Sequence, residues 1–111
     1  MKITADTNIL VRAITGDDER QSRIAQAELA AAEVVALTLP ALCELVWVLS
    51  RGYDVPVGEI ADVIRRLIES ETVAVNRPAA EAGLALLSAG GDFADGVFAY
   101  EGRCLVEGSL V

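Results

Sequence analysis

The chain has 111 residues, of which 53% are hydrophobic, and this is enough apolar material for one domain with a single core. A formal net charge of −8 argues against simple DNA binding through a basic surface, because that mode neutralises phosphates with lysine and arginine. The chain contains no histidine, which excludes serine–histidine and cysteine–histidine hydrolases, so acid–base or metal chemistry must rest on carboxylates.

The first third of the chain predicts one strand and two helices. Residues 2–5 form a short apolar strand, and residues 7–16 follow as a helix that ends at glycine. The apolar face of this helix consists of Leu10, Val11 and Ile14. Residues 17–33 predict a second helix, because acidic residues occupy its first turn. The predicted buried register of this second helix consists of Ile24, Ala27 and Ala31.

The middle of the chain predicts a strand followed by two helices. Residues 34–38 form a buried strand, and residues 39–52 predict a helix with proline in its first turn and glycine at its end. The apolar stripe of this helix consists of Leu42, Leu45, Val46 and Leu49. Residues 55–70 repeat the helical pattern with Val57, Ile60, Ile64, Leu67 and Ile68.

The last part of the chain completes an alternation of strands and helices. Residues 72–76 predict a third strand, and residues 77–91 predict a fifth helix that begins beside proline and stops at glycine. Residues 92–102 predict a sixth, short helix, and a last strand is expected in residues 103–107 or 108–111. This alternation predicts an α/β sandwich with a central, mainly parallel sheet, in which ligands bind at the carboxyl ends of the strands.

No stretch of the sequence has the pattern of a membrane or export segment. No apolar run approaches the roughly 20 residues that a spanning helix needs, and the N-terminus lacks a basic region followed by an apolar run. We therefore expect a soluble, cytoplasmic protein. The two cysteines, Cys43 and Cys104, lie in apolar surroundings without a CxxC pairing, and we expect both to be reduced core residues.

Asp6 stands directly after the first predicted strand, in the sequence ADTN. One interpretation is structural, because an aspartate that precedes a helix accepts a free backbone N–H and contributes about 0.5–2 kcal/mol. The other interpretation is that Asp6 is a metal ligand, because its strand ends there and ligand sites gather at such ends.

Glu44 lies within ALCELVWVL, a helical segment that is apolar on nearly every side. We expect this glutamate to lack a solvent-rich face, and a buried carboxylate is costly unless it is paired or bound to metal. The structural alternative is a salt bridge to an arginine elsewhere in the chain.

Asp92 and Asp95 stand three residues apart in GGDFADGV, a spacing that puts both on one helical face, where like charges repel. The structural interpretation makes Asp92 an N-cap and Asp95 an acid that the helix dipole favours. The functional interpretation makes Asp95 a metal ligand and leaves Asp92 as a cap or supporting acid.

The candidate acids follow different strands, and we expect them to converge at one end of the sheet. One comes after the first strand, one lies in the helix after the second strand, and one begins a late helix. Oxygen ligands without histidine favour Mg²⁺ or Mn²⁺ over zinc. A divalent ion held by carboxylates can polarise a phosphodiester and activate its bound water as a nucleophile.

Three segments resemble a known family in their order and spacing. ITADTNILVRAI, LTLPALCELVWVLSRGY and SAGGDFADGVFAYEG resemble the PIN-domain ribonucleases, in particular the VapC toxins of bacterial toxin–antitoxin pairs, over essentially the whole chain. The resemblance implies a PIN-like fold and an endoribonuclease that cleaves RNA with Mg²⁺ or Mn²⁺, forms a homodimer and is silenced by a cognate antitoxin protein. It implies catalytic and metal-binding roles for Asp6, Glu44 and Asp95, with Thr7 and Asn8 as polar support.

The sequence departs from the family pattern at its end. Relatives usually continue into a strand followed by another aspartate, so we expect a single PIN-like domain over residues 1–111 that lacks the family's C-terminal end. The alternative function is therefore a catalytically impaired module that binds proteins. An aspartyl-nucleophile phosphatase is a more distant alternative, because it would need an aspartate at the position of Asn8. A partner surface is also expected around Trp47 and Tyr53, since this region carries more apolar residues than one core needs.

Overall fold

Three short parallel strands form the sheet of the protein. The computed structural model describes residues 1–109 and places β1 (Lys2–Thr4), β2 (Val34–Ala36) and β3 (Val73–Ala74) in the order β1-β2-β3. Both pairs are parallel, and Val35 of the central strand lies opposite Ile3 on one side and Val73 on the other. The predicted α/β fold with a parallel sheet is confirmed.

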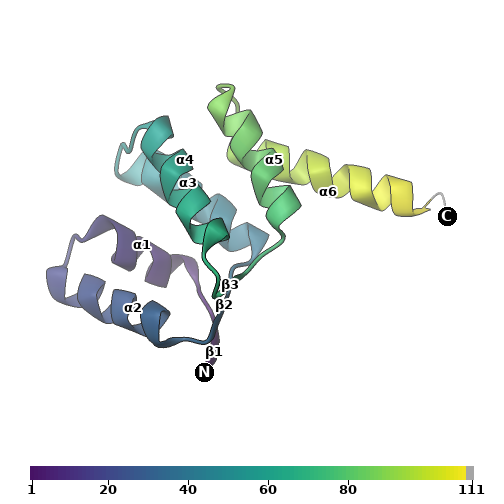
Figure 1. The fold of residues 1–111 in the computed structure, drawn as a ribbon. Helices are drawn as coiled ribbons and strands as arrows, with labels where there is room; N and C mark the ends of the chain where they lie inside the picture. The colour runs from purple at the N-terminus through teal and green to yellow at the C-terminus, as the bar shows by residue number, and fades with distance from the viewer. Residues whose placement is uncertain (110–111) are drawn as a thin grey trace.

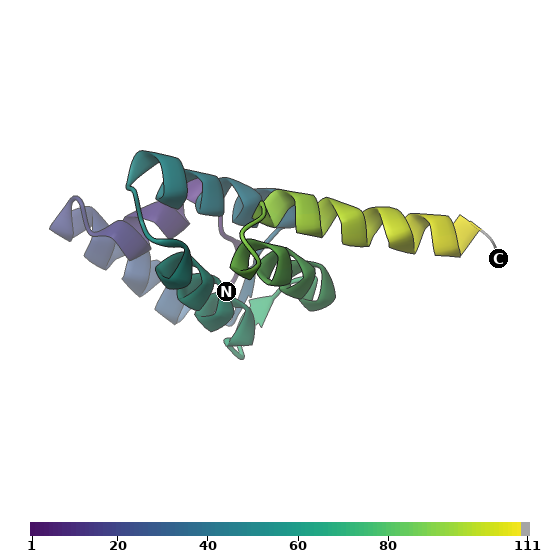
Figure 2. The ribbon, with the colours of Figure 1, turned by 90° about the horizontal axis from the view of Figure 1, so that it is seen from above.

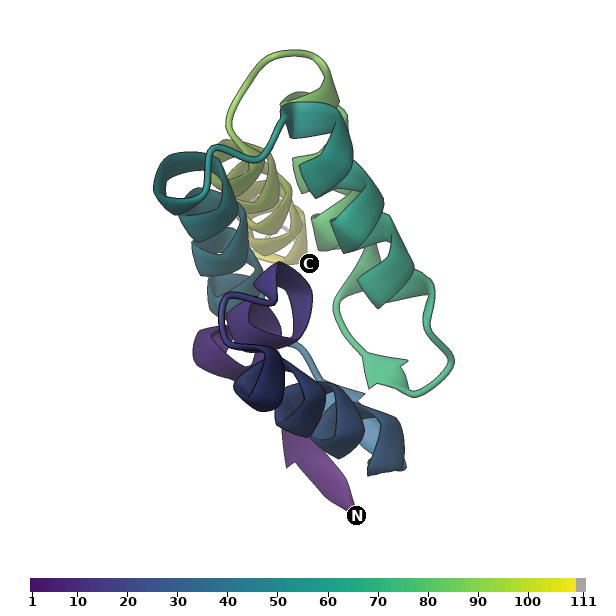
Figure 3. The same cartoon turned by 90° about the vertical axis from the view of Figure 1, so that its left-hand side faces the viewer.

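Helices connect the strands and flank the sheet (Figure 1). Helix α1 packs against α2 and α3, and α4 packs against α3 and α5. The sheet lies at the base of these helices when the molecule is seen from the side of α1 and α2 (Figure 3). The second half of α6 projects beyond the other elements (Figure 2). The helices are α1 (Thr7–Thr15), α2 (Glu19–Ala31), α3 (Leu39–Gly52), α4 (Val57–Glu69), α5 (Arg77–Ser88) and α6 (Phe93–Ser109).

Local chemistry fixes where most of these helices begin. The side chains of Asp6, Asp18, Thr38 and Asn76 each accept a backbone N–H in the first turn of the helix that follows. Proline stands in the first turn of α3 and of α5, where a missing N–H costs nothing. These signals are local in the sequence, which is why the helix starts could be predicted.

One hydrophobic core lies between the sheet and the helices. The apolar stripe predicted for α3 is confirmed, because all four of its residues are buried. Helix α4 contributes Ile60, Ile64 and Ile68, whereas the predicted member Val57 is 48% exposed because it stands at the first residue of the helix. The largest side chains in the core are Phe93, Leu10, Leu42, Leu45, Leu49, Ile60, Ile64 and Val97.

The predicted register of α2 is wrong. Ile24 is 50% exposed, and Ala27 and Ala31 are also exposed, whereas Ser22 and Ala25 are buried. Helix α2 therefore turns a face of small residues toward its neighbour α1, and the apolar stripe is shifted by one position from the predicted one. Alanines on several faces made the sequence periodicity ambiguous.

The predicted strand at residues 103–107 is also wrong, because these residues continue α6 without a break. Residues in this segment such as Glu101, Arg103 and Leu105 favour helix, and the single glycine at position 102 costs only about 1 kcal/mol. The alternative prediction of a strand at residues 108–111 is wrong for its first two residues, because Gly108 and Ser109 also belong to α6. The rest of that segment, residues 110 and 111, lies outside the described residues.

Helices α5 and α6 cross at very short distance through two glycines. A Cβ atom placed on Gly96 would lie 2.6 Å from the carbonyl oxygen of Ala82 and 2.9 Å from the Cα atom of Gly83. A Cβ atom on Gly83 would lie 2.8 Å from the ring of Phe93. The two backbones can approach this closely only because neither position carries a side chain.

The cysteines differ from their predicted environment. Cys43 is half-buried and Cys104 is exposed on the projecting part of α6, so the prediction of two core cysteines is wrong for Cys104. Both are free thiols, as predicted. Within the described part of the chain, no helix is long and apolar enough to cross a bilayer.

Candidate functional site

Asp6 connects the end of β1 to the start of α1. Its backbone is extended, and its Oδ1 atom accepts the backbone N–H of Ile9 at 2.8 Å. The predicted helix cap is therefore present. It uses one carboxylate oxygen, and the side chain as a whole is exposed to solvent. Its Oδ2 atom accepts no hydrogen bond from residues 1–109, so capping does not exclude a second role as a ligand.

The side chain of Glu44, on α3, is held at the start of α1 by a hydrogen bond. The hydroxyl of Thr7, the residue after Asp6, donates to the Oε2 atom of Glu44 at 2.8 Å, although the two residues are 37 positions apart. Thr7 therefore ties the carboxylate of α3 to the beginning of α1. This bond places Glu44 beside the residue that follows Asp6, and it gives Thr7, a predicted support residue, a hydrogen-bond partner on α3.

The environment predicted for Glu44 is wrong, because its side chain is exposed. Helix α3 buries one stripe only, and Trp47, which made the segment look apolar on every side, is itself 65% exposed. The structural alternative of a salt bridge to arginine is absent among the described residues. The carboxylate therefore has solvent on one side and a single hydroxyl donor on the other.

The pair of Asp6 and Glu44 suits a hard divalent cation. Both groups present oxygen, and no basic side chain within residues 1–109 is ion-paired with either of them. Mg²⁺ is commonly bound through one or two protein carboxylates, together with waters and substrate phosphates. The oxygen donors and the uncompensated charge therefore fit a site for Mg²⁺ or Mn²⁺.

The third predicted acid stands on a different element. Asp95 is exposed in the first turn of α6, and Asp92 precedes this helix and accepts the backbone N–H of Ala94 at 3.2 Å. The cap predicted for Asp92 is thus present. Among the described residues, no group of three or more acidic or thiol side chains is close enough to hold one metal ion. Thr7 links Glu44 to the residue next to Asp6, whereas Asp95 forms no three-residue group with them among the described residues.

Electrostatics nevertheless link the beginning of α6 to α3. Burial raises the pKa of the Cys43 thiol, and the carboxylates of Asp92 and Glu101 raise it further. Cys43 immediately precedes Glu44. The carboxylates of Asp92, just before α6, and of Glu101, within α6, therefore act electrostatically on α3 one residue away from the candidate site. The negative potential around the first half of α3 is therefore larger than Asp6 and Glu44 alone produce, and a bound cation would reduce it.

Asn8 lines a small pocket beside α1. This pocket has a volume of about 230 Å³, and its other lining residues include Arg12, Asp17, Asp18 and Tyr53. The hydroxyl of Tyr53 donates to the Oδ2 atom of Asp17 at 2.6 Å, and this hydrogen bond raises the pKa of Tyr53. Sequence reasoning missed this bond and the position of Arg12. The helical spacing of Asn8, Arg12 and Thr15 was the signal that could have shown their shared face.

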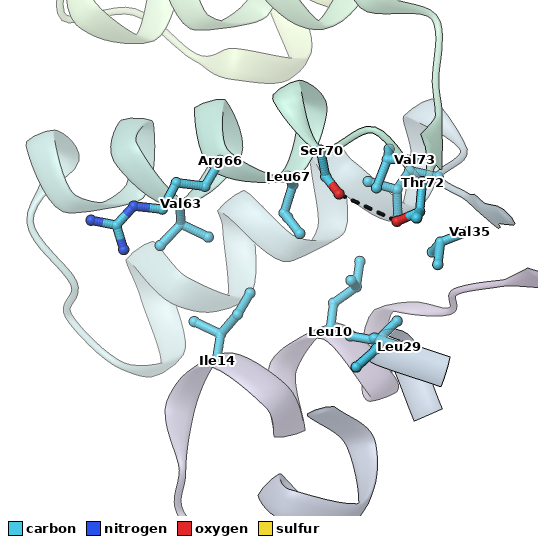
Figure 4. A pocket seen from close by; sticks show the side chains of 12 residues that line it. Leu10, Ile14, Leu29, Val35, Val63, Arg66, Leu67, Ser70, Thr72 and Val73 are labelled. Carbon is cyan, nitrogen blue, oxygen red and sulfur yellow. Dashed lines mark hydrogen bonds between the residues drawn. The ribbon is translucent and has the colours of Figure 1, made fainter. Parts of the chain in front are cut away.

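An apolar cavity lies elsewhere, between α1 and α2 on one side and α4 and β3 on the other (Figure 4). It has a volume of about 510 Å³ and is lined mainly by leucine, isoleucine and valine side chains. Arg66 is the charged residue that lines it, and none of the candidate acids does. An apolar cavity without carboxylates does not suit a hard cation, so this cavity is not the proposed metal site.

Comparison with protein families gives a match over most of the chain. A family model described as PIN domain matches residues 3–99. This range includes Asp6, Glu44, Asp92 and Asp95. No curated protein matches the chain.

Proposed function

The chain belongs to the PIN domain family, and on this premise we propose that it is a Mg²⁺- or Mn²⁺-dependent endoribonuclease, the VapC-type toxin of a toxin–antitoxin pair. Members of this family are typically nucleases and generally bind divalent metals. The observation that carries the proposal is the hydrogen bond from Thr7 to Glu44, because it holds a second carboxylate beside Asp6 at the end of β1.

Asp6 and Glu44 would hold the ion in this proposal. When bound, the ion would polarise the phosphodiester and make its bound water a better nucleophile. The helix cap orients Asp6, and the hydroxyl of Thr7 orients Glu44, so both carboxylates are preorganised before substrate arrives. Asp95 is proposed as a further catalytic ligand, Asp92 as the cap that positions its helix, and Asn8 as a polar group beside the substrate.

The proposed partners require surfaces other than the acidic site. We propose that an antitoxin segment places an apolar side chain in the cavity beside Arg66, which offers a cation to a protein partner (Figure 4). A homodimer is supported by the exposed Phe98 and Val106 of α6, which are 60% and 62% accessible. In this proposal residues 1–111 act as one PIN-like domain.

The second candidate function is a PIN-like module that binds proteins and has lost catalytic power. The specific observation in its favour is that Asp95 is not grouped with the other two acids in the described residues. Two carboxylates would then bind an ion weakly, and the apolar cavity would be the functional surface of the protein.

The test of the proposed function is cleavage of a panel of structured RNAs by the purified chain. We expect fragments in millimolar Mg²⁺ or Mn²⁺ and none in EDTA, because the site must neutralise two carboxylates before an RNA phosphate can approach. Cleavage that persists in EDTA would contradict a metal-dependent mechanism. Intact RNA with either metal would favour the binding module.

A further inference from the structure

The only tryptophan of the chain stands exposed one helical turn after Glu44. Trp47 is 65% accessible, the largest aromatic surface that the described residues offer to solvent. Its neighbours one turn away on α3 are Cys43, Glu44, Ser50 and Arg51, so the ring stands beside polar and charged side chains of its own helix. A large ring among polar and charged side chains favours a ligand with a flat aromatic surface and charged groups.

Trp47 shares one stripe of α3 with Glu44 and Arg51. At 3.6 residues per turn, positions 44, 47 and 51 fall within an arc of about 60°, and they span a rise of about 10 Å. All three side chains are exposed. The stripe thus leads from the carboxylate that Thr7 holds, across an indole ring, to a guanidinium group.

Helix α1 lies beside this stripe and adds a second cation. Hydrogen bonds join α1 and α3 at both ends, from Thr7 to Glu44 at the start and from Tyr53 to Asp17 just after the two helices end. The exposed Arg12 lies on α1 between these two connections. Neither Arg12 nor Arg51 is ion-paired within the described residues, although the chain carries 17 acidic residues.

We propose that Trp47 stacks on a base of the RNA strand beside the cleaved phosphodiester, while Arg51 and Arg12 contact its phosphates. The identity of the ligand rests on the proposed function, whereas the position of the ring rests on the helical stripe alone. Base–aromatic stacking tolerates any sequence, because every base has a π-face, and it requires an unpaired base. Trp47 is therefore a positioning residue that holds a single-stranded segment against the carboxylate pair.

The unique tryptophan makes the proposal directly measurable. Its fluorescence is recorded while a short single-stranded RNA oligonucleotide of mixed sequence is added in Ca²⁺, chosen to allow binding with little cleavage. We expect saturable quenching of the emission and much less quenching by the same oligonucleotide annealed to its complement. If the emission changes with the concentration of the protein and not with the concentration of RNA, the ring lies between two copies of the chain and the proposal is overturned.

Substitutions separate stacking from simple apolar contact. With dye-labelled RNA and fluorescence anisotropy, we expect Trp47→Leu to weaken binding about 10- to 100-fold and Trp47→Phe to retain most of the affinity. Ile24→Ala is the control, because it truncates an exposed apolar side chain on α2, and it should bind as the wild type does. Equal affinities for the Trp47→Leu variant and the wild type would overturn the proposal.

The cleavage rate distinguishes this inference from the proposed function. If RNA is cut in Mg²⁺ and Trp47→Leu has an unchanged KM, stacking is refuted and the nuclease stands. If the wild type neither binds nor cuts RNA, the proposed function fails and the inference fails with it.

Discussion

Asp6→Asn and Glu44→Gln are each expected to lower metal-dependent RNA cleavage by about 100-fold or more, the scale on which a preorganised electrostatic contact is lost. Both changes remove a negative charge and keep the local hydrogen bond. Asparagine caps helices as well as aspartate does, and glutamine can still accept from Thr7. The free energy of unfolding should therefore change little, so that lost activity reports on the site and not on the fold.

Initial cleavage rates and circular dichroism melting curves of the same preparations check this prediction. Glu81→Gln is the matched control, because it removes one exposed carboxylate on α5 away from the candidate site. Asp95→Asn should also reduce the rate if Asp95 is a third ligand. Full activity of both the Asp6→Asn and Glu44→Gln variants would refute the assignment of the site.

Gly96→Ala is expected to destabilise the protein by about 1–3 kcal/mol or more, the range observed when a packed site is overfilled. The new methyl group would lie 2.6 Å from the carbonyl oxygen of Ala82, a backbone atom that cannot rotate away. Helix α6 would have to move off α5, and Phe93 would lose part of its packing, because it is fully buried where α6 begins.

The control for this prediction is the same substitution elsewhere on the same helix. Gly102 has open space where a Cβ would lie, so Gly102→Ala should stabilise the protein by about 0.5–1 kcal/mol through helix propensity alone. Urea unfolding curves of the two variants measure both effects. If the two substitutions shift the midpoint in the same direction, the close crossing of α5 and α6 does not exist in solution.

Signals that are local in the sequence predicted much of the fold correctly. Asp6 caps the helix that follows it, as one of its two interpretations predicted, and prolines stand in the first turns of α3 and α5. The strands were predicted because short apolar runs alternate with these helices. Such features depend on neighbours a few residues away, so no knowledge of the tertiary structure was needed.

Features that depend on tertiary contacts were predicted poorly. The exposure of Glu44 follows from which stripe of α3 faces the core, and an apolar sequence such as ALCELVWVL does not define that stripe. The close crossing of α5 and α6 at Gly83 and Gly96 depends on contact between two helices, and it was not predicted. The hydrogen bond between Thr7 and Glu44 joins residues 37 positions apart, so sequence spacing alone could not predict it.

The most direct test of the central claim is divalent-metal binding by the folded chain, measured by isothermal titration with Mn²⁺ and by melting temperature. We expect saturable binding and a melting temperature that rises with Mn²⁺, with about 1.4 kcal/mol of added stability for each tenfold excess of free Mn²⁺ over the dissociation constant. Both effects should be lost in Asp6→Asn and Glu44→Gln and kept in Glu81→Gln. Equal melting of the wild type in EDTA and in millimolar Mn²⁺, or undiminished Mn²⁺ binding by both site variants, would contradict it.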